Sequence, residues 1–232
     1  MINYLLIDIL IVIFPLISNI KWKFKYHHYH KHLFPSIAIV GSSYVIWDII
    51  VTHRGDWWFN SKYLIGVNIL GLPIEEILFF VTVPYSCIFI YENLSHFTIE
   101  KEVIYSKFFY YLIMTLFFIF GLIYVKQDYT ILSLFSCGLF FLVSNTFYSK
   151  ILKSRNYWLY IIISFIPFIF FNYLLTSLVV VFYNPDAILG IRITTIPLED
   201  FFYNYSMLSF YLLVYVYFKD NWSGKSTHNS YQ

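Results

Sequence analysis

Charged residues are scarce in this sequence. They make up 12% of its 232 residues, while 59% are hydrophobic and the mean hydropathy is +0.67. A soluble globular domain carries about 25% charged residues, so the composition argues against that class. Cysteine is also scarce: Cys87 and Cys137 both lie inside apolar runs, and no disulfide framework is expected. The sequence therefore predicts an integral membrane protein.

Several kinds of chemistry lack their motifs. There is no glycine-rich string of the dinucleotide or P-loop type. There is no Asp-Asp-x-x-Asp stretch for magnesium-diphosphate chemistry, and no lysine inside an apolar run for a retinal Schiff base. The histidine tract at residues 27–32 is interpreted as a headgroup-facing loop rather than a metal site. We expect neither a metal nor a cofactor.

Seven apolar runs approach the roughly 20 residues that a membrane-spanning helix needs. The predicted spans are residues 2–20, 33–51, 73–92, 107–125, 130–147, 158–182 and 198–218. The first run lacks a charged start and a cleavage site, so it is interpreted as a retained helix rather than a signal peptide. Residues 64–72 are too few to span, and we expect an interfacial or re-entrant segment there.

Lysine and arginine predict the orientation, because they are enriched in cytoplasmic connections. With the N-terminus outside, 11 of the 15 basic residues fall on the cytoplasmic side and 4 on the outer side. The cytoplasmic ones are Lys21, Lys23, Lys25, Lys31, Lys101, Lys107, Lys150, Lys153, Arg155, Lys219 and Lys225. The outer ones are Arg54, Lys62, Lys126 and Arg192. We expect a multi-pass protein of the cytoplasmic membrane with its C-terminus in the cytoplasm.

An acidic motif occurs twice, each time at the start of an apolar run. Residues 66–76 read GVNILGLPIEE and residues 190–200 read GIRITTIPLED, which align at an offset of 124 residues. The same offset places Ile46-Trp47-Asp48 opposite Phe170-Phe171-Asn172, inside the second span of each half. The sequence thus contains an internal repeat that extends beyond the motif.

The repeat maps the first three spans onto the last three and leaves one span as a connector. Because the connector is a single span, both halves run in the same direction. We therefore expect an all-α membrane protein of two parallel three-helix repeats, which is a known way to build a site at a repeat interface. The predicted division is a first repeat at 1–92, a connecting loop and helix at 93–129, a second repeat at 130–218 and a cytoplasmic tail at 219–232.

The motif places two acids after a proline in each copy: Glu75 and Glu76, then Glu199 and Asp200. Burying a carboxylate in hydrocarbon costs several kcal/mol, so intramembrane acids are functional by default. With the prolines at first helical positions, the acids would lie in the first turn, where the helix dipole favours anions. Solvated helix caps are one interpretation, and the duplication favours a shared functional site.

Such acids can perform proton transfer on an apolar substrate. A carboxyl group in an apolar cavity retains its proton and can protonate an alkene, while a second carboxylate collects a proton elsewhere. Aromatic rings, 24% of the chain, would stabilise the carbocation, although membrane interfaces also favour Tyr and Trp. Candidate residues near such a site are Trp47, Asp48, Phe79, Phe80, Arg192, Phe201, Phe202 and Tyr203. Among them, Arg192 is a candidate partner of the acids and Asp48 a polar hydrogen-bonding residue.

The motifs, Pro73-Ile74-Glu75-Glu76 and Pro197-Leu198-Glu199-Asp200, resemble the paired Pro-x-Glu-Glu/Asp motifs of the small membrane lycopene cyclases. The chain resembles the fused form of that family over residues 1–218, without a phytoene synthase extension. The resemblance implies a carotenoid β-cyclase that needs no flavin or other cofactor. It also implies Glu75 and Glu199 as the leading acid/base groups, with Glu76 and Asp200 as their partners.

The partners implied are lycopene or a related linear carotenoid and the lipid bilayer, with no nucleic acid. An association with other carotenoid enzymes is left open. Two other functions also remain open: a sister carotenoid enzyme that adds water to the same cation, and a proton-coupled carrier, because parallel repeats with buried acids also occur in transporters.

Overall fold

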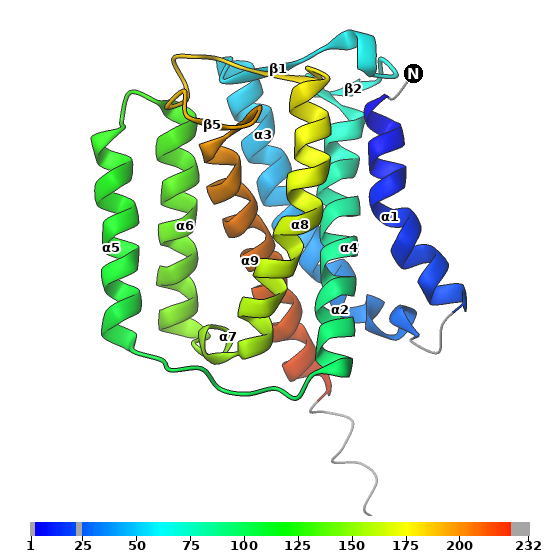
Figure 1. The fold of residues 1–232 in the computed structure, drawn as a ribbon, viewed down its shortest axis with the longest axis vertical. Coiled ribbons are helices and arrows are strands. Elements are labelled where there is room, and N and C mark those ends of the chain that lie inside the picture. The colour runs from blue at the N-terminus through cyan, green and yellow to red at the C-terminus, as the bar shows by residue number, and fades with distance from the viewer. Residues whose placement is uncertain (1–2, 22–24, 224–232) are drawn as a thin grey trace, which may run out of the picture.

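The structure, a computed structural model, describes residues 3–21 and 25–223. Within these ranges, seven helical segments run side by side between the two ends of the molecule (Figure 1). They are α1 (Tyr4–Lys21), a continuous segment made of η1 (Tyr26–Tyr29), α2 (His30–Ser36), η2 (Ile37–Gly41) and α3 (Ser42–Arg54), then α4 (Ile74–Phe97), α5 (Lys107–Ile123), α6 (Asp128–Phe147), α8 (Arg155–Ser177) and α9 (Leu198–Ser223). Each predicted span falls on one of these segments, which confirms the all-α membrane architecture.

Four of the segments are long and apolar enough to cross a membrane: Tyr26–Arg54, Ile74–Phe97, Asp128–Phe147 and Arg155–Ser177. A short helix, α7 (Lys150–Lys153), joins α6 to α8 at the end of the bundle where α9 finishes (Figure 1). The predicted cytoplasmic Lys23 and Lys225, and positions 224–232 of the predicted tail, lie outside the described residues.

Short strands gather at the opposite end of the bundle, where α1 begins (Figure 1). There β1 (Trp57–Phe59) pairs with β4 (Val181–Tyr183), β2 (Asn68–Ile69) with β3 (Leu72–Pro73), and β5 (Arg192–Ile193) with β6 (Ile196–Pro197), all antiparallel. A turn of 3-10 helix, η3 (Ser61–Tyr63), follows β1. The segment 64–72, expected to be interfacial or re-entrant, therefore contains most of a hairpin.

Two local predictions are wrong. Pro73 and Pro197 do not occupy first helical positions: each is the last residue of a strand, and the helices begin at Ile74 and Leu198. The hairpin is the reason, because the N–H groups of Ile74 and Leu198 donate to the carbonyl seven residues earlier at 2.9 Å. The histidine tract at 27–32 is helical rather than a loop, since it continues from Tyr26, a buried residue.

The elements repeat at the predicted offset. Strands β1, β2 and β3 begin 124 residues before β4, β5 and β6, and α4 begins 124 residues before α9. Trp58 pairs with Phe182, its own counterpart, and their rings stack at 5.9 Å. A pseudo-two-fold axis therefore passes between these two residues. The repeats are parallel, as predicted, because equivalent helices of the two halves point the same way (Figure 1).

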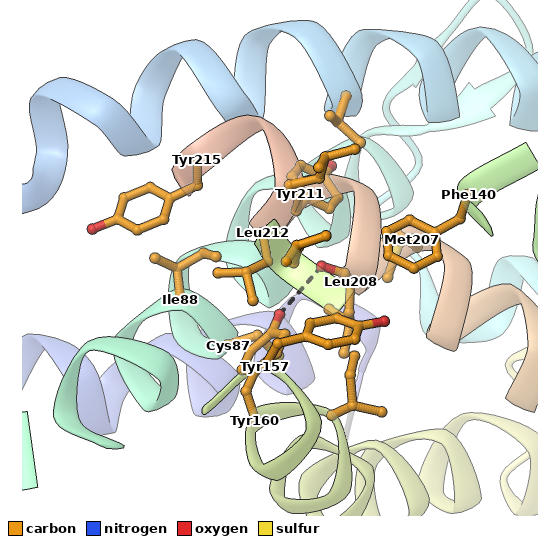
Figure 2. Packing of buried hydrophobic residues seen from close by; sticks show 14 of the residues in the cluster. Cys87, Ile88, Phe140, Tyr157, Tyr160, Met207, Leu208, Tyr211, Leu212 and Tyr215 are labelled. Carbon is orange, nitrogen blue, oxygen red and sulfur yellow. Dashed lines mark hydrogen bonds between the residues drawn. The ribbon is translucent and has the colours of Figure 1, made fainter. Parts of the chain in front are cut away.

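The core lies where α9 packs against α2, α4, α6 and α8, and tyrosine is the most frequent residue among its buried side chains (Figure 2). Buried tyrosine hydroxyls need partners, and here they find them. Tyr160 donates to the carbonyl of Leu208 at 3.4 Å, and Tyr211 donates to that of Phe80 at 2.8 Å. Since lipid is as apolar as the core, these hydrogen bonds and close packing hold the helices together.

The connector α5 packs chiefly on α6, and glycines permit the contact. A Cβ atom on Gly138 would lie 2.8 Å from the ring of Phe118, and one on Gly121 would lie 2.6 Å from the ring of Phe135. Small residues of this kind let membrane helices approach each other closely.

Gly138→Ala should therefore destabilise the protein by about 1–3 kcal/mol, because the ring of Phe118 must move. Thermal unfolding in detergent measures the effect. Leu139→Ala is the matched control. Leu139 is the next residue along α6, and its side chain is 47% exposed, away from the contact with Phe118. Equal melting temperatures for Gly138→Ala and the unaltered protein would contradict this account of the helix pair.

Candidate active site

The first acid of each motif binds the backbone that leads into its own hairpin. Glu75 accepts a hydrogen bond from the N–H of Ile65 at 2.6 Å, and Glu199 accepts one from the N–H of Leu189 at 2.7 Å. These are equivalent contacts, since residues 65 and 189 are 124 positions apart. Thr130 also donates to Glu199, at 2.6 Å.

Glu75 and Glu199 are 0% and 1% exposed, so neither is the solvated helix cap that the sequence also allowed. Their second carboxyl oxygens are buried and have no hydrogen-bond partner within residues 3–21 and 25–223. Neither side chain lines the cavity described next. Both acids thus bind the hairpins on the side away from the cavity.

The second acid of each motif, Glu76 or Asp200, faces a shared cavity of about 290 Å³. The two acids of one motif diverge because adjacent residues on a helix point about 100° apart. The cavity lies between α1, α4, α8 and α9, with β1 and β4 at the strand end. Its lining is mostly apolar and aromatic, with Phe79, Phe168 and Phe171 among the rings. One acid from each repeat therefore lies in the same apolar space.

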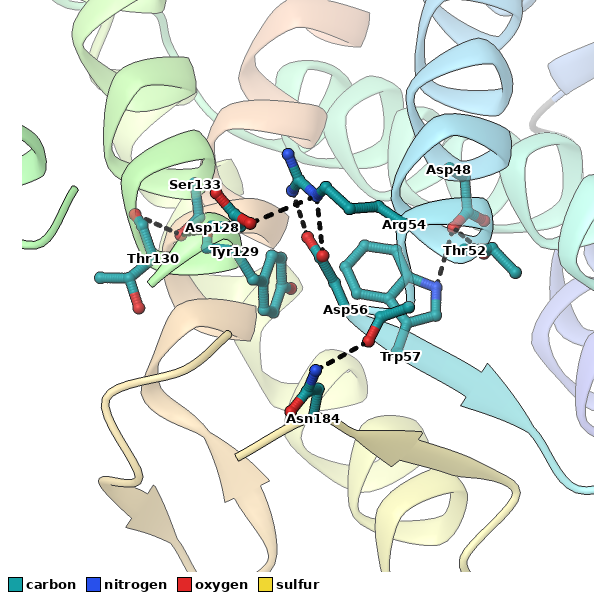
Figure 3. Close-up of polar contacts among 11 residues, drawn as sticks. Asp48, Thr52, Arg54, Asp56, Trp57, Asp128, Tyr129, Thr130, Ser133 and Asn184 are labelled. Carbon is teal, nitrogen blue, oxygen red and sulfur yellow. Dashed lines mark hydrogen bonds and ion pairs between the residues drawn. The ribbon is translucent and has the colours of Figure 1, made fainter. Parts of the chain in front are cut away.

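Glu76 has polar neighbours on α1 and α3. The hydroxyl of Tyr4 on α1 donates to its Oε2 at 2.7 Å. From α3, the carboxyl group of Asp48 lies against it. Asp48 is 0% exposed, and the indole N–H of Trp57 donates to its Oδ1 at 3.0 Å (Figure 3). Glu76 and Asp48 thus form a pair of carboxyl groups in contact.

Asp200 has a different environment, made of neutral donors. It accepts hydrogen bonds from the hydroxyl of Tyr129 at 2.7 Å, the hydroxyl of Tyr183 at 2.8 Å and the amide of Asn172 at 2.9 Å. Burial, and then the neighbouring Asp200 carboxylate, raise the pKa of the Tyr183 phenol well above its usual value. The Tyr183 hydroxyl on β4 therefore remains a donor.

Within residues 3–21 and 25–223, the acids that line the cavity form no ion pair with a basic residue. The ion pairs of the described residues are Arg54 with Asp56 and Asp128, Lys150 with Asp220, and Lys219 with Glu92. The Arg54 pairs lie at the strand end, where Asn184 also donates to the carbonyl of Gly55 at 3.0 Å (Figure 3). These contacts join α3 to α6 and the β4 segment, and so hold the two repeats together.

Arg192, predicted as a partner of the acids, lies on exposed β5. Its guanidinium stands over the ring of Tyr183 at 5.7 Å and donates to the carbonyl of Thr195 at 2.7 Å. It reaches Asp200 only indirectly, through Tyr183.

The other predicted binding residues divide into three groups. Phe79 and Tyr203 line the cavity. Trp47 and Phe80 pack around Tyr44, outside it. The rings of the remaining two lie on other faces of α9: Phe201 stacks on Phe165 at 6.1 Å, and Phe202 contacts Phe117 at 6.0 Å.

Sequence reasoning missed several residues that contact the acids: Tyr4, Tyr129, Tyr183 and Trp57. It also missed Asp8 on α1, which is 2% exposed and accepts a hydrogen bond from Thr82 at 3.4 Å. The rule that intramembrane acids are functional could have found Asp8, which lies in the first span. The tyrosines carried no such signal, because 23 tyrosines are spread along the chain.

Larger rings stand at some of the positions that correspond, in the other repeat, to residues of the cavity lining. Four lining residues have a bulkier counterpart 124 positions away in the other repeat. Phe171 corresponds to Trp47, Phe168 to Tyr44, Asn204 to Phe80 and Cys87 to Tyr211. The ring of Tyr44 stacks on those of Trp47 and Tyr211 at 5.9 and 6.5 Å. The duplication thus supplies one acid from each repeat to the same cavity.

The fold and the site define a class: a duplicated membrane protein that holds one acid from each repeat in an apolar cavity. The family model described as lycopene cyclase matches this chain twice, at residues 2–94 and 126–218. The two matches are themselves 124 residues apart and together cover more than half of the chain. The chain belongs to the lycopene cyclase family, in its fused two-repeat form. No curated protein and no solved structure gives a significant match.

The hairpin contacts of the first acids lead to a stability prediction. Glu75→Ala removes the acceptor of the Ile65 N–H and should lower the free energy of unfolding by about 1–3 kcal/mol. Glu199→Ala should cost at least as much, because Thr130 loses its partner too. Thermal unfolding in detergent and hydrogen exchange at residue 65 measure the change.

Glu102→Ala is the control, because Glu102 is an exposed acid on a loop outside the helices. If Glu75→Ala melts at the same temperature as this control, the hairpin role of Glu75 is wrong.

Proposed function

We propose that this chain is a lycopene β-cyclase that converts the linear ends of lycopene into β-ionone rings. A proton added to the terminal double bond of one end creates a tertiary carbocation. The neighbouring double bond attacks this cation, which closes the ring and moves the charge inward. Loss of a ring proton completes the product. One proton is added and one is removed, so the reaction is an isomerisation without net redox change.

The observation that carries the proposal is the pair Glu76 and Asp200, equivalent acids of two repeats in one apolar cavity. One group must give a proton and another must take one, and paired carboxyl groups in different environments can divide these roles. We assign the proton transfers to Glu76 and Asp200, which line the cavity. We assign Glu75 and Glu199 to the hairpins that position them.

The cavity lining supports a cationic intermediate. Aromatic faces attract cations, and the rings of Phe79, Phe171 and Tyr203 line the same space as both acids. No lysine or arginine is among its described lining residues, so no fixed positive charge opposes the carbocation. An apolar enclosure also limits the access of water, which would otherwise capture the cation.

The substrate would enter from the bilayer. Leu10 and Phe14 on α1 line the cavity and are also 41% and 57% exposed on the outside of the bundle. The cavity thus reaches the lipid-facing surface beside α1. We infer that the end group occupies the cavity while the rest of the polyene extends into lipid.

The excess of basic residues at the α7 end favours that end as cytoplasmic, which would place the acids near the outer leaflet.

Expression in lycopene-accumulating cells tests the activity directly. We expect the red pigment to be replaced by cyclic carotenes on chromatography. Glu76→Gln and Asp200→Asn should each lower the conversion about a hundredfold or more, because each removes a proton-transfer group. Glu102→Gln should convert lycopene normally.

Each variant must be shown in the membrane in equal amount by immunoblot. Unchanged lycopene with inserted, unaltered protein would reject the cyclase, and a hydroxylated product would identify a hydratase instead. Near-normal conversion by both cavity variants would reject the assignment of Glu76 and Asp200.

The cavity that both acids line predicts the order of products. Because one cavity contains both acids, a symmetric substrate must withdraw and re-enter with its other end. A time course with the protein in vesicles should show a free monocyclic carotene before any bicyclic product. Bicyclic product that forms from the first time points, with no free monocyclic carotene, would contradict the single-cavity account.

A further inference from the structure

The two cavity acids, Glu76 and Asp200, have different neighbours on the second helical segment of their own repeat, which is α3 for Glu76 and α8 for Asp200. Asp48 contacts Glu76, while its counterpart Asn172, 124 positions later, contacts Asp200. At this position the repeats are matched in geometry and differ in chemistry. An aspartate and an asparagine have nearly the same shape, but only the aspartate can hold a proton on its side-chain oxygen.

In the first repeat, the buried carboxyl group of Asp48 lies against that of Glu76, and a hydrogen bond between them requires a proton, because two ionised carboxylates have only acceptors. The other contacts do not supply one to this bond. Trp57 donates to Oδ1 of Asp48, Tyr4 donates to Oε2 of Glu76, and Oδ2 of Asp48 is buried without a donor in the described part of the chain. Two carboxyl groups in such contact share one proton, as in other carboxyl pairs.

In the second repeat, the environment suits an ionised carboxylate. Asp200 accepts from three groups that are all donors, namely Tyr129, Tyr183 and Asn172. An ionised carboxylate only accepts and has room for these bonds, whereas a protonated one would have to give up an acceptor site. Hydrogen bonds to the charged form are what keep a buried carboxylate ionised.

We propose that Asp48 is a positioning residue that stores a shared proton with Glu76, so that Glu76 is the proton donor and Asp200 the acceptor. The proposal rests on the cyclase function given above. In each turnover, Glu76 passes the shared proton to the terminal alkene carbon, and Asp200 removes a proton from the closed ring. The cycle ends when Asp200 releases its proton to solvent and the Asp48–Glu76 pair takes one up, so no other reactant is consumed.

Other titratable groups face the Asp48–Glu76 pair, so the pH dependence of the activity reflects all of these groups together. Tyr4 and Asp8 approach from α1, and Glu75 from α4 itself. Asp200 and Tyr203 face it from α9, and Tyr183 from β4. Each of these is an acid or a phenol, so no basic group in the described ranges competes for the role of proton donor.

A reciprocal exchange tests the proposal. Asp48→Asn gives Glu76 an amide donor, so Glu76 should lose its proton more readily and cyclisation at neutral pH should fall about a hundredfold. Its activity should recover as the pH is lowered. Asn172→Asp places a second carboxyl beside Asp200, so Asp200 should retain a proton and activity should recover as the pH is raised. The two pH–rate profiles should therefore move in opposite directions.

Ser144→Ala is the matched control, because Ser144 is buried in α6 and contacts only backbone carbonyls. Its profile should coincide with that of the unaltered protein. Profiles of the two exchange variants that move the same way, or an unchanged profile for Asp48→Asn, would overturn the assignment of donor and acceptor.

A measurement that does not need turnover separates this proposal from the cyclase function. Infrared spectra of the purified protein at neutral pH should contain the carbonyl band of a protonated carboxyl group. Asp48→Asn and Glu76→Gln should each remove that band, and Asn172→Asp should add one. If Asp48→Asn fails to fold, Glu76→Gln still gives the result. If none of these variants changes the band, the proposal of a shared proton is wrong, even if lycopene is cyclised.

Discussion

The structure depends on carboxyl groups that are buried in an apolar bundle without basic partners. Asp48, Glu75 and Glu199 are at most 1% exposed, and the ion pairs of the described residues lie elsewhere. An isolated buried carboxylate is costly, so each acid must be neutral or satisfied by donors. The hairpins, the tyrosines on α1, α6 and β4, and the contact between Asp48 and Glu76 all supply that compensation.

Symmetry brings the acids together, and departures from symmetry allow them to differ. The pairing of Trp58 with Phe182 puts equivalent strands across a pseudo-two-fold axis, so Glu76 and Asp200 approach the same space. Residue differences between the two repeats then change the surroundings of each acid separately. Larger rings such as Tyr44 and Trp47 stand where the second repeat has Phe168 and Phe171 of the cavity lining, and Asp48 faces one acid where Asn172 faces the other.

The two adjacent acids of each motif lie in different surroundings. The first acid faces the backbone of its hairpin and the second faces the cavity, because successive residues on a helix point about 100° apart. A single short motif thus supplies both the group that binds the backbone before the helix and the group that lines the cavity. This arrangement explains why the acids occur as adjacent pairs.

Much of the architecture could be predicted from the chain alone. Seven helical segments and the parallel repeat followed from apolar runs and the 124-residue offset, since helix length and bilayer thickness constrain each other. The motif also identified four acids, but it could not tell Glu76 from Glu75. That distinction depends on which side of α4 faces the cavity. The contacts of Tyr4, Tyr129 and Tyr183 with the acids join residues about 17 to 72 positions apart. Such contacts exist only after the helices have packed, so the tertiary structure decided them.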